Sequence, residues 1–182
     1  RGEIMNKKEI FLAGSTFWGG RAFLEQLPGV IETEYGLTDV DSGTVVETFL
    51  LAYPDSEYLG TTECIRVVYD ADIIPLATLL KAFFITVDPF STKKQINYTE
   101  GMPQAKIFYV DPEDELVADK QIAELQQRFD RPVTIACVPL EGFTVAGKYA
   151  EDFIKRNYGE TLIIDPKLAD DFAKSHADEF GV

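Results

Sequence analysis

The segment from Phe11 to Gly20 joins a strand-like run to a helix-like run through one tight turn, and this junction limits the folds open to the chain. Glu9 to Ala13 is a short apolar run ending at Gly14, which is typical of a buried strand. Ser15 or Thr16 can cap the following helix. Pro28-Gly29 ends that helix, whose apolar positions keep helical spacing: Phe17, Trp18, Ala22, Phe23 and Leu27.

The same alternation of strands and helices continues along the chain. Strands are predicted over residues 30–38, 61–69, 105–110 and 133–138, and a turn over 39–43, whereas 44–59 fits neither pattern. The polar stretch 87–101 predicts a long loop lying over a site. Helices are predicted from Pro75, from Asp111, over 146–157 and over 166–180. The helix from Pro75 carries the apolar residues Leu76, Leu79, Leu80, Phe83 and Phe84. The helix from Asp111 carries Leu116, Val117, Ile122 and Leu125. Without an internal repeat or linker, this order predicts a single α/β domain over residues 1–182.

Composition narrows the classes of partner. The 182 residues carry 31 acidic and 17 basic side chains, a formal net charge of −14. Such a chain repels nucleic acid and anionic membranes, which are both polyanionic. It also lacks an apolar run of the roughly 18 residues that a membrane span requires. We therefore expect no nucleic-acid or membrane partner. The N-terminal residues lack an apolar signal core, so we also expect a cytoplasmic protein.

Cysteine and histidine are scarce. Cys64 and Cys137 form no CxxC or other paired framework, which argues against disulfide-rich and zinc-binding classes. His176 is the only histidine, so a histidine-based triad or metal cluster is excluded in practice. Strand alternation points Cys64 away from the face of Glu63, and Cys137 alternates with core-like Val133 and Ile135. We expect neither thiol to be catalytic, and we predict no metal and no cofactor.

Five sequence blocks stand in a fixed order along the chain: Phe11-Leu12-Ala13-Gly14 with Thr16-Phe17-Trp18-Gly19; Leu27-Pro28-Gly29-Val30 with Thr33 and Gly36; Gly60-Thr61-Thr62-Glu63 with Val67-Val68-Tyr69-Asp70; Leu79-Leu80 and Phe83-Phe84 with Asp88-Pro89; and Phe143, Ala146 and Tyr149. Together these blocks resemble the A-type peptide methionine sulfoxide reductases, whose signature is Gly-Cys-Phe-Trp-Gly. The resemblance is strongest over residues 9–157, with 1–8 expected to be a flexible N-terminus. It implies an α+β two-layer sandwich with a mixed sheet and a ferredoxin-like core.

The family's chemistry implies roles for residues at matching positions. A cysteine thiolate attacks the sulfoxide sulfur and becomes a sulfenic acid, which a second thiol, usually thioredoxin, reduces. Phe17 and Trp18 match the aromatic pair that holds the substrate methyl group, although core packing would also explain them. Glu63 matches the carboxylic acid that protonates the oxygen, although an exposed strand carboxylate would look the same in the sequence.

Other positions depart from the family pattern. Thr16 stands where the family has its nucleophilic cysteine, and a helix N-cap explains a threonine there by itself. Leu37 stands near the place of one oxygen-binding tyrosine. The stretch 95–104 replaces another family motif, and Tyr98 or Glu100 is the candidate substitute within it. Thr61, Val87 and Ala150 stand at family histidine positions.

These departures leave three hypotheses. The chain is a pseudoenzyme of the reductase family that binds methionine-like or sulfoxide-like groups; or an active reductase whose cysteine was replaced by design; or an enzyme with other chemistry that uses Glu63 as acid or base. Several coordinated departures favour the first. Thioredoxin is expected as a partner only if thiol chemistry survives, and the predicted ligand is methionine sulfoxide or a similar small group or peptide.

Overall fold

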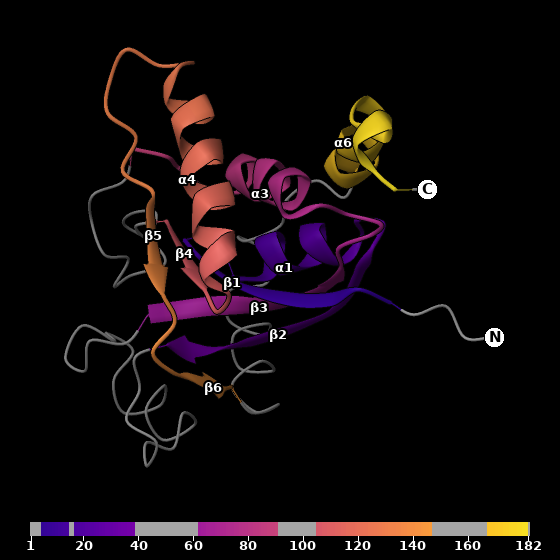
Figure 1. The fold of residues 1–182 in the computed structure, drawn as a ribbon, viewed down its shortest axis with the longest axis horizontal. Helices are drawn as coiled ribbons and strands as arrows, with labels where there is room; N and C mark the ends of the chain where they lie inside the picture. Colours follow the sequence, from indigo (N-terminus) through magenta and orange to yellow (C-terminus); the bar gives the residue numbers. More distant parts are fainter. Residues whose placement is uncertain (1–4, 15–16, 39–61, 91–104, 147–166, 182) are drawn as a thin grey trace.

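The computed structural model describes residues 5–14, 17–38, 62–90, 105–146 and 167–181. These residues form six strands and four α-helices, coloured along the chain in Figure 1. A short 3₁₀ helix, Ala177–Glu179, follows the last α-helix. In chain order the elements are β1 (Lys7–Ala13), α1 (Phe17–Glu25), β2 (Val30–Thr38), β3 (Thr62–Asp70), α3 (Leu76–Ile85), β4 (Lys106–Tyr109), α4 (Pro112–Gln126), β5 (Ala136–Pro139), β6 (Phe143–Val145) and α6 (Lys167–Ser175).

The strands form one mixed sheet in the order β5-β4-β1-β3-β2-β6. All neighbouring pairs are antiparallel except β4 and β5, which are parallel. The stretch β1-α1-β2-β3-α3-β4 folds into the four central strands in the order β4-β1-β3-β2, which is the ferredoxin-like split βαβ arrangement. This confirms the predicted α/β class and mixed sheet.

The main core lies between the sheet and the helices, which gather on one side of it in Figure 1. Alternate strand residues such as Ile10, Leu12, Ile65 and Val67 face these helices, because successive side chains of a strand point to opposite faces. The predicted stripe of α3 packs against them, with Leu76, Leu79, Leu80 and Phe83 buried. Leu116 of α4, in contrast, is 74% exposed.

A smaller apolar cluster lies on the opposite face of the sheet. It consists of Phe11, Ala13, Cys64 and Phe108, with Val138, Leu140 and Phe143 packed against it. The rings of Phe11 and Phe143 meet edge to face with centroids 4.9 Å apart. The same strands therefore serve two cores, a large one under the helices and a small one on the outer face.

Three predicted boundaries need correction. β1 begins at Lys7, so Lys7 and Lys8 belong to the sheet and not to a flexible N-terminus. β5 begins at Ala136 instead of Val133, because the amide of Thr134 donates to the carbonyl of Pro89 and not to β4. The helix predicted over 166–180 is two pieces, α6 and the 3₁₀ helix. At this break the hydroxyl of Ser175 donates to the carbonyl of Phe172, in competition with the backbone.

Four other predictions fall outside the described residues: the turn at 39–43, the stretch 44–59, most of the loop at 87–101 and the helix at 146–157. Within the part of the chain that is described, no helix has the length and apolar content needed to cross a membrane.

Candidate functional site

Gly14 forms the junction between β1 and α1, as the sequence predicts. Its φ is 105°, in the left-handed region that favours glycine. A Cβ at this position would lie 2.5 Å from Cα of Ala105, so the chain turns here in close contact with the segment that leads into β4. The tight turn places the start of α1 directly after the end of a central strand.

The first turn of α1 is the centre of the candidate site. The helix begins at Phe17 and continues through Trp18, so these two residues occupy its first backbone positions. The side chains of Phe17 and Trp18, and the whole of Thr16, lie outside the described parts. The first turn contains no acidic residue. Its amides therefore present the positive end of the helix dipole without a carboxylate of their own helix to offset it.

Glu63 lies near this helix start because of the register of β3. It is directly opposite Leu37 of β2. The β1–β3 register pairs Leu12 with Ile65, and two further residues along it bring Glu63 opposite Gly14. Glu63 shares the helix-covered face with Ile65, which belongs to the main core, and its side chain is half-buried. The fold thus brings this carboxylate to the strand end at which α1 begins.

Tyr35 is a residue on this face that the sequence interpretation missed. It lies two positions before Leu37 on β2, so both side chains point to the helix side, and both have 0% exposure. Leu37 supplies no hydroxyl, whereas Tyr35 places a buried phenol on the same face one residue pair from Glu63. The period-two pattern around Gly36 was the sequence signal for it.

Helix α1 is fixed to β2 by a polar cluster beside the site. The guanidinium of Arg21 donates through Nε to Oγ1 of Thr33 at 2.9 Å and through Nη2 to the Thr33 carbonyl at 3.1 Å. Arg21 also pairs with Glu25 one helical turn later, and the Thr33 hydroxyl donates to the same carboxylate. These contacts orient α1 on the strand that carries Tyr35 and Leu37.

The two cysteines lie away from the start of α1. Cys64 follows Glu63 but points to the outer face, where it is 2% exposed within the small apolar cluster. Cys137 lies on β5, at the far edge of the sheet from β2. Burial, followed by the carboxylates of Asp119, Glu115 and Asp114, raises the pKa of the Cys137 thiol to about 12. A thiol held protonated in this way is a poor nucleophile.

His176 lies at the end of α6 and not beside Glu63. Its ring stacks on Phe172 with centroids 4.1 Å apart. Its Nδ1 lies 2.9 Å from Oγ of Ser175 and 3.0 Å from the Phe172 carbonyl. The imidazole is thus held against its own helix, far along the chain from the strand end that carries Glu63.

The remaining predicted positions divide into two groups. Val87 is 8% exposed and belongs to the main core, so this position is used for packing. Tyr98 and Glu100, together with Thr61 and Ala150, fall outside the described residues. Among the residues that are described, no three His, Cys, Asp or Glu side chains are grouped so that they could hold a metal ion.

Comparison with known proteins agrees with this fold and these motifs. The sequence profile of the peptide methionine sulfoxide reductase family matches residues 8–179. The peptide methionine sulfoxide reductase MsrA of Clostridium perfringens is 34% identical over 152 residues, covering 82% of this chain and 93% of that protein. The chain belongs to the peptide methionine sulfoxide reductase family.

Two solved structures support the same fold. Reduced Mxr1 from Saccharomyces cerevisiae superposes with a TM-score of 0.67 at 20% identity, covering 86% of this chain and 89% of Mxr1. Mxr1 solved in complex with Trx2 gives a TM-score of 0.57 at 17% identity, covering 83% of this chain and 88% of Mxr1. At these identities the likeness concerns the architecture.

Proposed function

We propose that this chain is a family member that binds methionine sulfoxide or a similar group without carrying out the thiol reaction. The observation that carries the proposal is Thr16 at the position of the nucleophile, immediately before the Phe17-Trp18 pair. Neither Cys64, on the outer face, nor Cys137, on β5, lies where it could replace that residue.

Threonine is unsuited to the family reaction for a chemical reason. The reductase cycle passes through a sulfenic acid and a sulfur–sulfur bond, and an oxygen atom can form neither. A hydroxyl also needs a neighbouring base to become a nucleophile. The single histidine of the chain is held at the end of α6, so it does not serve that purpose.

The binding half of the site is proposed to persist. Phe17 and Trp18 would form the pocket for the methyl group, and Glu63 would hold the sulfoxide oxygen as a hydrogen-bond donor in its protonated form. Tyr98 is proposed as a further contact from the loop. The open first turn of α1 supports this arrangement, because its amides attract the partial negative charge of a sulfoxide oxygen.

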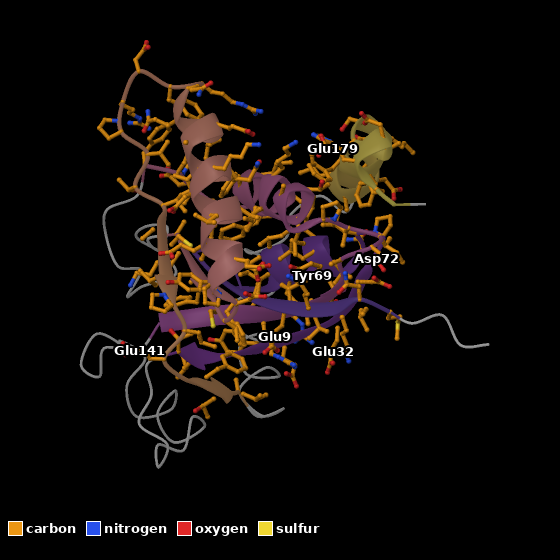
Figure 2. All side chains as sticks on the ribbon, in the orientation of Figure 1. Glu9, Glu32, Tyr69, Asp72, Glu141 and Glu179 are labelled. Atoms are coloured by element: carbon orange, nitrogen blue, oxygen red, sulfur yellow. The ribbon has the colours of Figure 1, made fainter. Side chains whose placement is uncertain are left out.

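Binding is measurable through Trp18, which is the only tryptophan of the chain. Titration with N-acetyl-methionine-S-sulfoxide amide is expected to change its fluorescence in a saturable way. Glu63→Ala should weaken this binding by about tenfold, because alanine cannot donate the hydrogen bond to the polarised oxygen. Glu32→Ala is the matched control, because Glu32 is an exposed carboxylate on the neighbouring strand β2 and is labelled in Figure 2.

Turnover tests the other half of the proposal. With methionine-S-sulfoxide and dithiothreitol, the protein should release no methionine above the background rate. Steady formation of methionine, lost on heat denaturation, would show that a thiol reaction survives and that the non-catalytic assignment is wrong.

Thr16→Cys asks whether only the nucleophile is missing. If the binding groups persist, the variant should release one equivalent of methionine and gain one oxygen in mass as a sulfenic acid. Thioredoxin is then the expected reductant for this variant. A variant that binds sulfoxide but gains no oxygen would show that groups needed for protonation are absent as well.

A further inference from the structure

A groove of about 200 Å³ lies between α3, α4 and α6, and none of its lining residues belongs to the candidate site at α1. Figure 1 shows these three helices on one side of the sheet. Phe84, Leu125 and Phe172 form its apolar surface. The volume is below the roughly 300–1,000 Å³ of a drug-sized pocket, so an occupant would have about the size of an amino acid.

Gln121 is the polar residue that distinguishes this groove from a packing defect. It lines the groove and is only 6% exposed. Gln121 is not among the described residues that carry a fully buried side-chain polar atom without a hydrogen-bond partner, so the polar atoms of its amide reach the open space of the groove. A ligand in the groove can therefore use this amide as a donor and an acceptor.

Two opposite charges line the groove near the end of α4. Glu124 lies in the last turn of this helix and Arg128 lies two residues after its last residue, so the two are four residues apart in the sequence. Among the described residues neither takes part in an ion pair. The other cation, Lys81, is already held by both carboxylate oxygens of Glu179 at 2.9 Å. The groove therefore offers one available carboxylate and one available guanidinium.

Glu179 is itself fully engaged and so does not compete for a ligand. The hydroxyl of Thr78 donates to it at 2.9 Å. Although burial alone would raise the pKa of Glu179, the hydrogen bonds from Lys81 and Thr78 lower it overall. This cluster holds the C-terminal segment against α3 and fixes the wall to which His176 and Phe172 belong; Figure 2 labels Glu179 there.

We propose that this groove binds a small zwitterion with an apolar body, namely a free apolar α-amino acid. Its carboxylate would pair with Arg128 and its ammonium with Glu124, while its side chain would rest on Phe84 and Phe172 and the Gln121 amide would bond to the head group. Both charges of the ligand are required, because Glu124 repels a simple carboxylate and Arg128 repels a simple amine.

The test compares L-leucine with two analogues that each lack one charge, 4-methylpentanoate and 3-methylbutylamine. Affinities come from calorimetric titration, and the site is located by NMR through the side-chain amide signals of Gln121. L-leucine should bind about tenfold more tightly than either analogue, because one charge-assisted contact is lost in each. Equal affinity for leucine and an analogue, or no shift at Gln121, would overturn the proposal.

Variants assign the two charges separately. Arg128→Gln should weaken leucine binding about tenfold and tighten the binding of 3-methylbutylamine, because the repelling cation is gone. Glu124→Gln should weaken leucine binding and tighten the binding of 4-methylpentanoate for the matching reason. Lys120→Gln is the control, since Lys120 is exposed on α4 but does not line the groove. Glu63→Gln should not alter leucine binding; if it does, the ligand occupies the candidate site at α1 instead, and the groove is wrongly assigned.

Discussion

The two faces of the sheet differ in the charged side chains that they carry. On the helix face, β1 and β3 contribute Ile10, Leu12, Ile65 and Val67 to one continuous core. On the outer face, the same strands carry Glu9 and Arg66, and Arg66 pairs with both Glu9 and Glu34 of β2. Charges on the outer face are therefore explained by their neighbours in the sheet. Glu63 is a carboxylate on the helix face, at the strand end where α1 begins, and this position is the basis for the role proposed for it.

The largest expected effect lies in the main core. Phe83 of α3 is completely buried there, so Phe83→Ala should lower the free energy of unfolding by about 3–5 kcal/mol. Leu116→Ala on α4 is the control, because Leu116 is 74% exposed and should change stability by no more than about 0.5 kcal/mol. Urea denaturation measures both. Similar losses for the two variants would mean that the helix face is not the dominant core.

Gly14 lies between the end of β1 and the start of α1. Its replacement should lower the free energy of unfolding nearly as much as Phe83→Ala. Gly14→Ala meets a positive φ, which costs about 1–2 kcal/mol, and contact with Ala105, which adds about 1–3 kcal/mol. Thermal or urea unfolding should show a loss of at least about 2 kcal/mol.

A second substitution separates these two causes. Ala105→Gly in the Gly14→Ala background removes one atom at the point of contact and should recover part of the loss. The remaining loss combines the backbone conformation with the contact to Cα of Ala105, which this substitution keeps. No recovery at all would show that the contact with Cβ of Ala105 contributes nothing to the loss.

The elements near these positions could be predicted because local patterns decide them. Strand-forming residues located β2, a capping residue and an apolar stripe located α1, and Pro75 with a second apolar stripe located α3. The glycine after an apolar run located the turn at Gly14. The start of β5 could not be found in this way, because Thr134 bonds to Pro89, which is 45 residues earlier in the chain. Local pattern carries no information about such a partner.

Residues that meet only through the packing of distant elements could not be predicted from the sequence either. Gln121 and Phe172 are unremarkable polar and apolar helix residues in the sequence, and only the packing of α3, α4 and α6 brings them to one groove. Tyr35 precedes Gly36 and Leu37 follows it, and the family motif marks only the position after the glycine. The register of β2 against β3 shows that both side chains lie on the helix face.

The two cysteines lie on opposite faces of the sheet, so their reactivities test the difference between these faces. At pH 8 the thiol of Cys137 should react with iodoacetamide at least about 100-fold more slowly in the native protein than in urea, since burial and the α4 carboxylates raise its pKa to about 12. Peptide mapping by mass spectrometry distinguishes it from Cys64. Fast native alkylation of Cys137 would reopen the question of a replacement nucleophile.

The raised pKa of Cys137 also has a consequence for stability. Its ordinary value is 9.0, so above this pH the unfolded chain loses the proton while the native protein keeps it. The native state then binds more protons, and stability contributed by this thiol must fall as the pH rises above about 9. Cys137→Ser should flatten the decline of the unfolding midpoint between pH 9 and the native pKa.

The smallest effect is expected on the outer face. Nε of Arg66 lies 2.7 Å from Glu9 and Nη1 lies 2.6 Å from Glu34, but the side chains of all three residues are 27–36% exposed. Solvent screens such pairs, so Arg66→Met should cost only about 1 kcal/mol in urea denaturation. The difference should shrink in about 1 M NaCl, where the screening length is about 3 Å. A loss that is large and insensitive to salt would mean that these charges behave as buried ones, and the distinction between the two faces would then rest on the apolar residues alone.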